Sequence, residues 1–490
     1  MNNASKSYYF YDLETSGFNP RTARIMQFAG QRTDMHLKPI GEPHNILIKL
    51  TEDILPDPQA IMVTGITPQQ TVMEGITEVE FLKIFNNEIA TPGTVFIGFN
   101  NLRFDDEFIR AINYRNFYDP YRWHWDESRS RWDLLDLVRM TRALRPEGIK
   151  WPTNEDGTPT NRLELVASEN GLEHTKAHDA LSDVLVTIKL AQMIKEKQPK
   201  LFDYLFQLSN KAAIQKLVNT GKPFIYTSGK YSNDTQKTTI VAKLADHLDK
   251  SGKVDGALVY DLRVDPSQFS KLTVKELVEA WRWKDKEDKS VRLPVKTMKF
   301  NRCPAIAPLE VITKAKNSTE ILDRLQLDMA KIEDNLTKLQ KMSGFVDKIN
   351  KAPEIMNSEQ EQKFKESNKH VDEQIYEGFI GGTDSQIAKK IQTVEPSELS
   401  GLSKSFKDQR MKKLLPLYKA RNFPSSLTSE EAENWQRYLK EQLMAGGQNS
   451  KLAEFFSKLE QVSEQSGLTK QQQSIIEDLD LYGQSLIFED

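Results

Sequence analysis

Cysteine is almost absent from this chain: among its 490 residues only Cys303 is present. A single cysteine excludes an intramolecular disulfide framework and any zinc site built from several cysteines. Long apolar runs are missing too, because no stretch approaches the roughly 20 residues that span a bilayer, and the polar N-terminus lacks the apolar segment of a secretory signal. We therefore expect a protein of the reducing cytoplasm with no membrane partner.

Net charge is also small, since 67 Lys and Arg stand against 70 Asp and Glu, for a formal charge of −3 at pH 7. No basic field surrounds the whole molecule, so a nucleic-acid surface would have to be a local basic patch. The remaining composition is that of an ordinary globular protein, 38% hydrophobic and 28% charged. Because such a length exceeds what one core usually serves, we expect about two to four domains.

Residues 8–17 contain the first pattern that carries chemistry. An aromatic run typical of a strand leads into Asp12 and Glu14 and ends at a Ser-Gly turn signal. Side chains alternate along a strand, so both carboxylates point the same way, with roughly 6.6 Å between their Cβ atoms. Ionised carboxylates at this spacing need a cation between them or a raised pKa. Hard oxygen ligands suit Mg²⁺ or Mn²⁺, although a solvated pair is the commoner meaning of Asp-x-Glu.

Two further acidic elements follow along the chain. Residues 94–99 are typical of a buried strand, and Asp105 comes where the following loop meets a helix, either facing the strand ends or merely capping that helix. His178 precedes another predicted helix and could reach over a neighbouring site, although a lone histidine there is more often a surface residue. Asp183 lies off the apolar stripe of this helix. The stripe comprises Leu181, Val184, Leu185, Ile188 and Ala191.

These residues, taken in order, resemble a known set. Asp12 and Glu14 on a strand, then Asp105, then His178 with Asp183 five residues later, are similar to the acids and histidine of DnaQ-like exonucleases of the DEDDh subgroup. Longer segments look like bacterial exonuclease I. They are residues 99–107, 114–121, 130–136, 144–149 and 198–206, with weaker similarity at 293–304 and 420–424.

The expected organisation has three parts. Short apolar runs alternate with amphipathic helices up to about residue 198. Short strands are then predicted at 223–227, 238–242, 256–260 and 295–300, with a helical insertion at 274–283. From about residue 358 the chain is predicted to be almost wholly helical. Residues 358–369 are polar enough for a linker, and Thr428 opens a capping box. The resemblance implies an RNase H-like α/β exonuclease domain over 1–198, an SH3-like β-rich domain over 199–355 and a C-terminal helical domain over 356–490.

The resemblance also implies a mechanism. Asp12, Glu14, Asp105 and Asp183 would bind two Mg²⁺ ions, with Mn²⁺ able to substitute, because four carboxylates supply about the charge that two such ions need. His178, with a usual pKa of about 6.5, would take the proton of the attacking water. Phosphodiester hydrolysis would then remove 5′-mononucleotides from 3′ ends of single-stranded DNA, processively, in DNA repair and recombination.

Arginines and aromatic residues alternate over residues 110–145, a combination that binds phosphates and unstacked bases without reading sequence. We expect about half of these aromatics to be core, and Asp133 and Asp136 in the same stretch to act as caps or salt-bridge partners. Beside Glu14, the resemblance singles out for strand contact Arg110, Tyr121, Trp125, Arg139, Arg162, Lys211, Lys296, Lys299 and Arg302.

A protein partner is implied as well. The family binds the acidic, hydrophobic C-terminal tail of single-stranded DNA-binding protein, for which Arg145, Tyr204 and Lys230 are the candidates, although residues 228–231 follow the family pattern only in part. We expect a monomer. Two alternatives stay open: a ribonuclease of the same superfamily, which would leave most residues beyond 206 without a role, and a non-catalytic scaffold, which would be expected to lack an acid or His178.

Overall fold

The computed structural model describes residues 6–173, 179–249, 251–282, 291–366 and 369–487, with the backbone alone for 360–366. The chain folds as two compact units, and each is described by itself. The first unit comprises residues 1–131, 174–188 and 369–490, and the second comprises 132–173 and 189–368. Among the described residues, none of the helices is long and apolar enough to cross a membrane.

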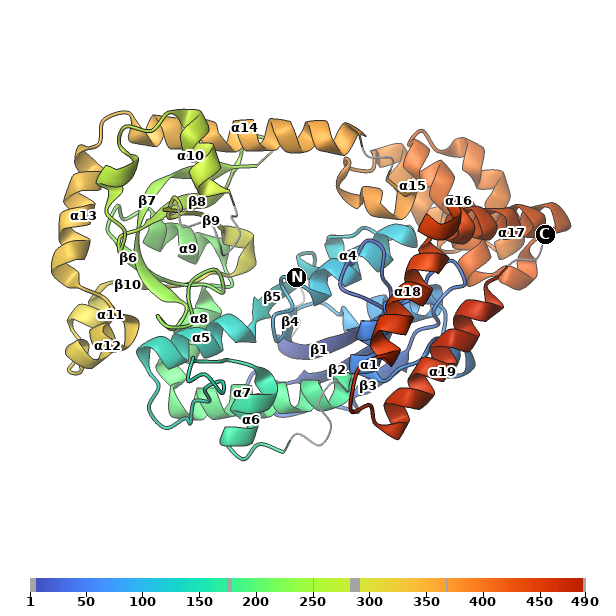
Figure 1. Ribbon diagram of the computed structural model, residues 1–490, viewed down its shortest axis with the longest axis horizontal. Helices are drawn as coiled ribbons and strands as arrows, with labels where there is room; N and C mark the ends of the chain where they lie inside the picture. The colour runs from blue at the N-terminus through green and yellow to red at the C-terminus, as the bar shows by residue number, and fades with distance from the viewer. Residues whose placement is uncertain (1–5, 174–178, 250, 283–290, 367–368, 488–490) are drawn as a thin grey trace. The chain divides into compact units, whose positions relative to one another are not determined.

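A five-stranded mixed sheet carries the first acidic residues, with the strand order β3-β2-β1-β4-β5 (Figure 1). The central strand β1 pairs antiparallel with β2 and parallel with β4. The strands are β1 Ser7–Thr15, β2 Ile25–Thr33, β3 His44–Leu47, β4 Thr94–Gly98 and β5 Ser130–Asp133. All five residues of β4 are buried, as its apolar sequence predicts.

Both faces of β1 are covered. Its odd-numbered aromatic residues pack into a core of phenylalanines with helices α3 (Glu78–Ile84) and α4 (Asp105–Arg115). On the other face Tyr8 and Phe10 are buried edge to face. Asp12 and Glu14 continue that same face, which confirms the alternation predicted from the sequence. The acids are therefore held on a strand whose position the core fixes.

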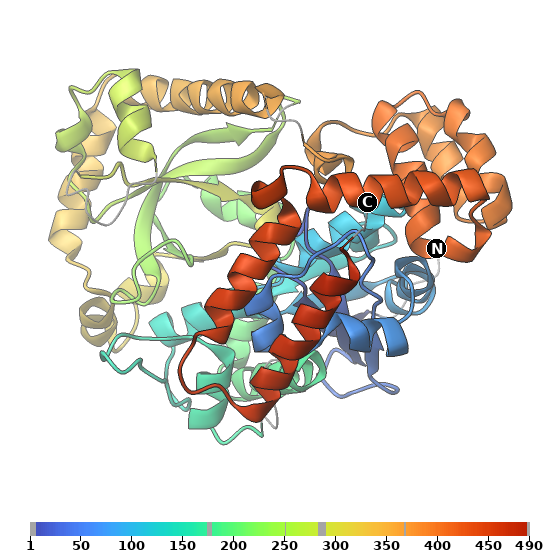
Figure 2. The ribbon, with the colours of Figure 1, turned by 45° about the vertical axis from the view of Figure 1, so that its right-hand side comes forward.

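The first unit is otherwise helical. Within it α18 and α19 pack side by side against α1 (Figures 1 and 2), and Leu452, Phe455 and Leu459 of α18 belong to their common core. The capping box at Thr428 is present at the start of α17. Its helices are α1 Pro58–Thr64, α2 Pro68–Glu74, α3, η1 Phe85–Ile89, α4, η2 Arg122–His124, the start of α7 Ala180–Lys197, η5 Val371–Tyr376, α15 Gly382–Ile391, η6 Pro396–Ser405, α16 Gln409–Asn422, η7 Pro424–Ser426, α17 Ser429–Met444, η8 Gly447–Asn449, α18 Lys451–Ser463 and α19 Lys470–Ser485.

The second unit contains an antiparallel sheet with the order β10-β6-β7-β8-β9, beside which α10 and α14 lie together (Figure 2). Four of its strands fall where the sequence predicts them. The elements are α5 Leu134–Leu144, α6 Leu163–Glu169, α8 Pro199–Gln207, α9 Lys211–Val218, β6 Phe224–Thr227, β7 Thr238–Leu248, β8 Val254–Asp261, η3 Pro266–Phe269, α10 Val274–Trp281, β9 Val295–Lys299, η4 Phe300–Arg302, β10 Ala305–Pro308, α11 Glu310–Thr313, α12 Ser318–Leu325, α13 Met329–Lys341 and α14 Phe345–Glu366.

One expectation about the connections is wrong. The polar segment predicted as a linker from residue 358 is helical as far as Glu366, because α14 runs through it. Its Glu, Gln and Lys residues are good helix formers, so low hydrophobicity alone did not indicate an irregular chain. The predicted limit at residue 355 falls inside this helix, and the three-domain division stays a prediction.

Candidate active site

Strand β1 brings Asp12 and Glu14 to its carboxyl end. The pairing of β1 with β2 becomes irregular between Glu14 and Thr15, where the regular ladder ends. Glu14 is 8% exposed, whereas Asp12 is half-buried. Since the strand is central in the sheet, these two carboxylates have little freedom to move apart.

Helix α7 contributes Asp183 from its first turn. Asp179 caps this helix: its side chain accepts a hydrogen bond from the Ser182 N–H at 3.0 Å, and its carbonyl accepts one from the Asp183 N–H at 3.0 Å. The Ala180 N–H donates to the side chain of Gln27 on β2 at 3.4 Å. The helix start is thus tied to the sheet, and this tie places Asp183 over β1.

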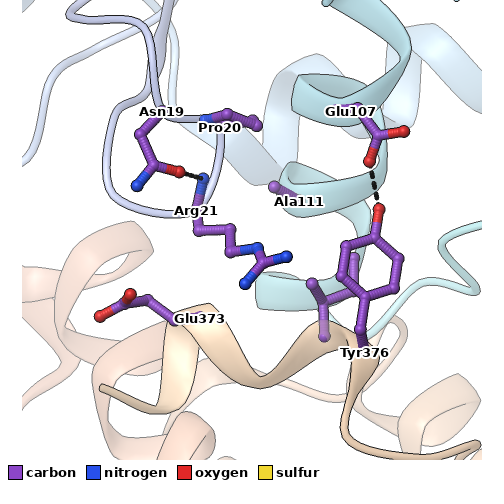
Figure 3. A pocket seen from close by; sticks show the side chains of 8 residues that line it. Asn19, Pro20, Arg21, Glu107, Ala111, Glu373 and Tyr376 are labelled. Carbon is purple, nitrogen blue, oxygen red and sulfur yellow. Dashed lines mark hydrogen bonds between the residues drawn. The ribbon is translucent and has the colours of Figure 1, made fainter. Parts of the chain in front are cut away.

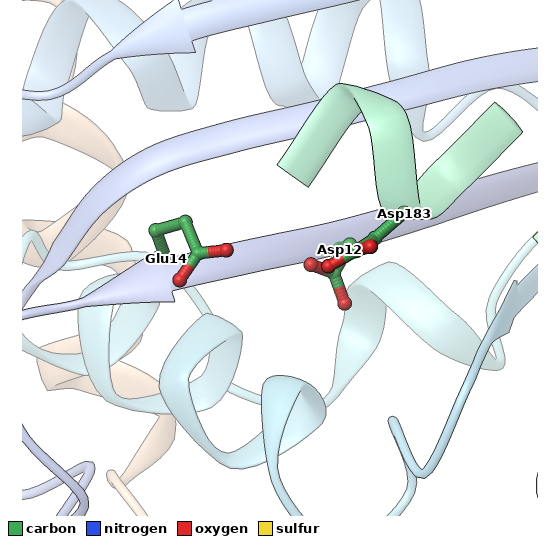
Figure 4. Close-up of side chains that lie close together, drawn as sticks. All are labelled: Asp12, Glu14 and Asp183. Carbon is green, nitrogen blue, oxygen red and sulfur yellow. The ribbon is translucent and has the colours of Figure 1, made fainter. Parts of the chain in front are cut away.

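Three carboxylates converge as a result. One oxygen from each of Asp12, Glu14 and Asp183 lies within 4.8 Å of the other two, as Figure 4 illustrates. The predicted position of Asp183 off the apolar stripe is therefore confirmed. Oxygen donors gathered at this spacing fit a hard divalent cation such as Mg²⁺ or Mn²⁺.

Asp105 lies beside this group but outside it. It is the first residue of α4 and is 3% exposed. The residue before it, Phe104, occupies the cap position of α4 and makes no side-chain cap hydrogen bond, so Asp105 is not the helix cap. Its charge nevertheless acts on the Asp12 carboxylate, as the pKa of Asp12 indicates.

A neighbour that the sequence did not single out fixes the start of α4. Asp106 is fully buried and accepts hydrogen bonds from the Tyr11 hydroxyl and the Arg131 guanidinium. Asn101 donates to the same carboxylate at 3.4 Å. Asp106 thus holds the first turn of α4 against β1, and the adjacent acids at 105 and 106 were the only sequence signal for this role.

Burial and mutual repulsion dominate the electrostatics of the cluster. Burial first, and then the charges of Asp105, Glu14 and Asp183, raise the pKa of Asp12 well above its usual range. Burial first, and then the charges of Asp183, Asp105 and Asp179, raise the pKa of Glu14 to about 8. The carboxylates therefore share protons near neutral pH unless a cation neutralises them. This donor set fits a divalent metal.

His178, the predicted general base, lies outside the described residues. Its role stays a prediction. Helix α7 begins two residues later, at Ala180.

Besides Glu14, three predicted strand-binding residues belong to the first unit. Arg110, on α4, is 7% exposed and pairs with Glu107 at 2.6 Å. Its guanidinium lies 5.4 Å from the ring centre of Tyr121. Trp125 is 60% exposed, whereas its neighbour Trp123 is buried in the core. This pair of tryptophans illustrates the predicted division between packing and surface aromatics.

Arg139 and Arg162 lie in the second unit. Arg139, on α5, forms an ion pair with Asp136 at 2.7 Å. Arg162 is the cap residue of α6, with a 62% exposed side chain 3.6 Å from Glu164. Asp133 caps α5 by accepting from the Leu135 N–H at 3.0 Å. The interpretation of Asp133 and Asp136 as capping and salt-bridging residues is confirmed.

The remaining predicted strand contacts are basic residues around the second sheet. The Lys211 ammonium donates to the Val254 carbonyl at 2.8 Å. Lys296 donates to the Lys230 carbonyl at 3.1 Å and lies 4.9 Å from the ring centre of Tyr231. The other two are Lys299, paired with Asp255 at 2.8 Å, and Arg302, half-buried in η4.

The predicted partner-binding residues come from three elements of the second unit. Arg145 follows α5 and donates to the Val311 carbonyl at 3.3 Å. Tyr204 lies on α8, where burial raises its pKa to about 12. Lys230 is exposed in the turn after β6. A binding site made from these residues stays a prediction.

Comparisons with known proteins bear on all parts of the chain. A family model described as "Exonuclease" matches residues 9–191, "Exonuclease I SH3-like domain" matches 209–353, and "Exonuclease I C-terminal domain" matches 369–486. Exodeoxyribonuclease I of Haemophilus influenzae is 37% identical, over 98% of this chain and 99% of its own length. That of Escherichia coli K12 is 39% identical, over 88% of each chain.

Solved structures agree. Exonuclease I from Methylocaldum szegediense is 37% identical and covers 99% of this chain and 100% of its own, with a TM-score of 0.89. Escherichia coli exonuclease I in complex with a dA16 oligonucleotide is 36% identical over 98% of this chain and 100% of its own, also with a TM-score of 0.89. The predicted fold class, an exonuclease domain with SH3-like and helical domains, is confirmed. The chain belongs to the exodeoxyribonuclease I family.

Proposed function

We propose that this protein degrades single-stranded DNA from the 3′ end and releases 5′-mononucleotides by phosphodiester hydrolysis. The observation that carries the proposal is the convergence of Asp12, Glu14 and Asp183, from a central strand and a helix start, within 4.8 Å. Such a cluster has no use in a non-catalytic scaffold, because burial and repulsion make it costly to keep.

Asp12, Glu14, Asp105 and Asp183 would hold divalent cations, Mg²⁺ first and Mn²⁺ as a substitute. When bound, such ions supply positive charge for the attacking and leaving oxygens of an in-line displacement. Escherichia coli exonuclease I has been solved in a zinc-bound form in complex with single-stranded DNA, so that relative binds a divalent cation. The preference of this chain for Mg²⁺ is part of the proposal.

The chain's own residues would position the strand and move the proton. Glu14 would also contact the terminal nucleotide, and His178 would accept the proton of the attacking water. Neutral imidazole is available for this at the pH of the cytoplasm, since its usual pKa is about 6.5. The arginine and aromatic residues named above would hold the strand by phosphate contacts and base stacking.

DNA is favoured over RNA by the relatives. Escherichia coli exonuclease I has been solved with dA16 and with a labelled dT13 oligonucleotide. The deoxyribonuclease relatives align over nearly the whole length of this chain, including the residues beyond 206 that a small ribonuclease would not need. We therefore propose processive action on DNA, in repair and recombination, by a monomer in the cytoplasm, where a bacterial cell keeps its DNA.

Another solved structure supports a protein partner. It contains an exonuclease I with single-stranded DNA-binding protein and an inhibitor. We propose that Arg145, Tyr204 and Lys230 contribute to an equivalent site here, with the two cations meeting an acidic tail and Tyr204 its apolar side chains.

Digestion of one oligonucleotide labelled at its 5′ end, beside the same strand labelled at its 3′ end, tests the proposal. Immediate release of the 3′ label as mononucleotide, in Mg²⁺ and not in chelator, is expected. Asp183→Asn should abolish release, whereas Asp203→Asn, at an exposed position on α8, should not change it. Release of the 5′ label first, or equal digestion of a matched RNA, would contradict the proposal.

A further inference from the structure

A small hollow lies between three elements of the first unit, one of which is far from the other two in the sequence. Helix α4 and the short helix η5 line it together with the loop that follows β1, and its volume is about 300 Å³ (Figure 3). Polar residues line it from all three elements. They are Asn19, Arg21, Glu107, Glu373 and Tyr376.

An unbroken series of contacts runs along one wall of this hollow. The Tyr376 hydroxyl donates a hydrogen bond to the Glu107 carboxylate, as the dashed line in Figure 3 marks. Glu107 pairs with Arg110 at 2.6 Å, one turn further along α4. The Arg110 guanidinium in turn lies 5.4 Å from the ring centre of Tyr121.

We propose that Tyr376 is a positioning residue for Arg110: by binding Glu107 it holds Arg110 beneath Tyr121 and so sets the affinity for the DNA strand. The inference rests on the proposed function, because it takes Arg110 and Tyr121 as strand-contacting residues. It adds that a residue of the C-terminal segment controls their position.

Burial makes Arg110 depend on its partner. Its side chain is 9% exposed, and its Nε is buried without a hydrogen bond to any residue in the described part of the chain. A charge in such a position is stable only where a counter-charge meets it, so the guanidinium follows the Glu107 carboxylate. Charge-assisted contacts of this kind are also directional. They fix which face of the planar Arg110 guanidinium lies against the Tyr121 ring.

Contacts at both ends of its side chain hold Tyr376, and its hydroxyl also interacts directly with the Arg110 side chain. The tyrosine is 42% exposed and borders the hollow, so dense packing does not fix its ring. On one side the Arg21 guanidinium lies 5.2 Å from the ring centre, and at the other end the hydroxyl binds Glu107. Removing only the hydroxyl therefore releases Glu107 while leaving the packing of the unit nearly unchanged.

Binding of a poly-dT oligonucleotide in chelator, measured by fluorescence anisotropy at several salt concentrations, tests this inference without requiring catalysis. Tyr376→Phe should weaken binding roughly three- to tenfold, the effect of losing one well-placed charged contact. It should also reduce the salt slope by about 0.7, the value for one phosphate contact on a single strand. With Mg²⁺ the KM should rise by a similar factor while kcat stays within about twofold.

Two further variants make the test specific. Tyr438→Phe removes a comparable hydroxyl bond, to His370 at 2.9 Å in the same unit, and should leave both binding and salt slope unchanged. Arg110→Gln should weaken binding as Tyr376→Phe does. The double variant should then bind no more weakly than Arg110→Gln alone, because both changes remove the same contact.

Additive effects of the two changes would overturn the inference, as would an unchanged salt slope in Tyr376→Phe. So would a fall in thermal stability that accounts for the lost binding. A different result would show that the proposed function is wrong. The wild-type protein would then bind the oligonucleotide in chelator but release no mononucleotide in Mg²⁺.

Discussion

Arg421 and Asp53 form a buried ion pair although 368 residues separate them in the chain. The Arg421 Nη2 lies 2.6 Å from an Asp53 carboxylate oxygen, and the two side chains are 4% and 1% exposed. Asp372 joins them, since it accepts from Arg421 at 2.9 Å and from Arg24 at 2.6 Å. These contacts tie the C-terminal helices to the unit that carries the acidic cluster, and they explain why both belong to one compact unit.

Loss of Arg421 should therefore unfold the first unit more easily. Arg421→Met leaves Asp53 and Asp372 buried with fewer counter-charges, and we expect the free energy of unfolding to fall by about 3–5 kcal/mol. Urea unfolding measures this. Arg437→Met is the matched control, because Arg437 is exposed and contacts only a nearby asparagine among the described residues. Equal stability of the two variants would mean that the buried pair adds nothing to the fold.

The same network predicts an acid limit to stability. Burial alone would raise the pKa of Asp372, but Arg421 and Arg24 outweigh it and hold the pKa well below its usual range. The pKa of Asp53 is lowered in the same way, because Arg421 outweighs the effect of burial. Depressed pKa values stabilise the fold above the unfolded value of about 3.9, and that stability is lost as the pH falls through the folded values.

Urea midpoints at pH 7, 5, 4 and 3 test the sign. From these groups the wild-type protein should lose no stability between pH 7 and 5, and should lose it steeply below about pH 4. The stability difference between wild type and Arg421→Met should shrink over the same acid range. A difference that grows as the pH falls would contradict the assignment.

The acidic cluster should cost stability when no metal is bound. Because burial and repulsion raise the pKa of Asp12, its ionised form is unfavourable in the folded state near neutral pH. In chelator at pH 8, Asp12→Asn should then raise the free energy of unfolding by about 0.5–2 kcal/mol, and in Mg²⁺ it should abolish activity. Asp203→Asn should do neither. A less stable Asp12→Asn protein in chelator would contradict this expectation.

Addition of Mg²⁺ should make the wild-type protein more stable than Asp12→Asn, the reverse of their order in chelator. A ligand that binds only the folded state stabilises it, and the gain grows with the logarithm of ligand concentration over Kd, so Mg²⁺ should raise the melting temperature of the wild-type protein. Asp12→Asn, which lacks one ligand, should gain less. Equal gains in both proteins would place the metal elsewhere.

The acids of the site could be predicted from the sequence because their signals are local. Alternation along one strand placed Asp12 and Glu14 together, and the position of Asp183 off an apolar stripe placed it toward them. The prediction that all five residues of this stripe are buried was correct only in part, because Leu185 is 40% exposed. Leu185 lies on the same side of α7 as Ser182 and Lys189, which is the solvent side. Residues three or four positions apart lie near one another on a helix, so this spacing alone does not show where the buried face ends.

The buried ion network could not be predicted. Its members look like ordinary surface charges in the sequence, and only the tertiary fold brings them together. They are Arg24, Asp53, Glu78, Arg115, Asp372 and Arg421. Strand β10 was missed for a simpler reason, since four residues ending in a proline carry too little periodicity to indicate a strand.

Gly229 should matter for strand binding through Arg139. A Cβ added at Gly229 would lie 3.1 Å from both terminal nitrogens of the Arg139 guanidinium, closer than ordinary contact. Gly229→Ala should therefore push Arg139 away from its place beside Asp136 and weaken binding of single-stranded DNA severalfold. Stability should change little, because the flexible end of an arginine can move aside.

Oligonucleotide binding in chelator checks this. Gly401→Ala is the control, since nothing lies within 4 Å of a Cβ at that position. If Arg139 contacts a phosphate, Gly229→Ala should also lower the salt slope of binding by up to about 0.7, and Arg139→Gln should do the same. Weaker binding with an unchanged slope would mean that the alanine disturbs the turn after β6 rather than a phosphate contact, and Arg139 would then have no part in holding the strand.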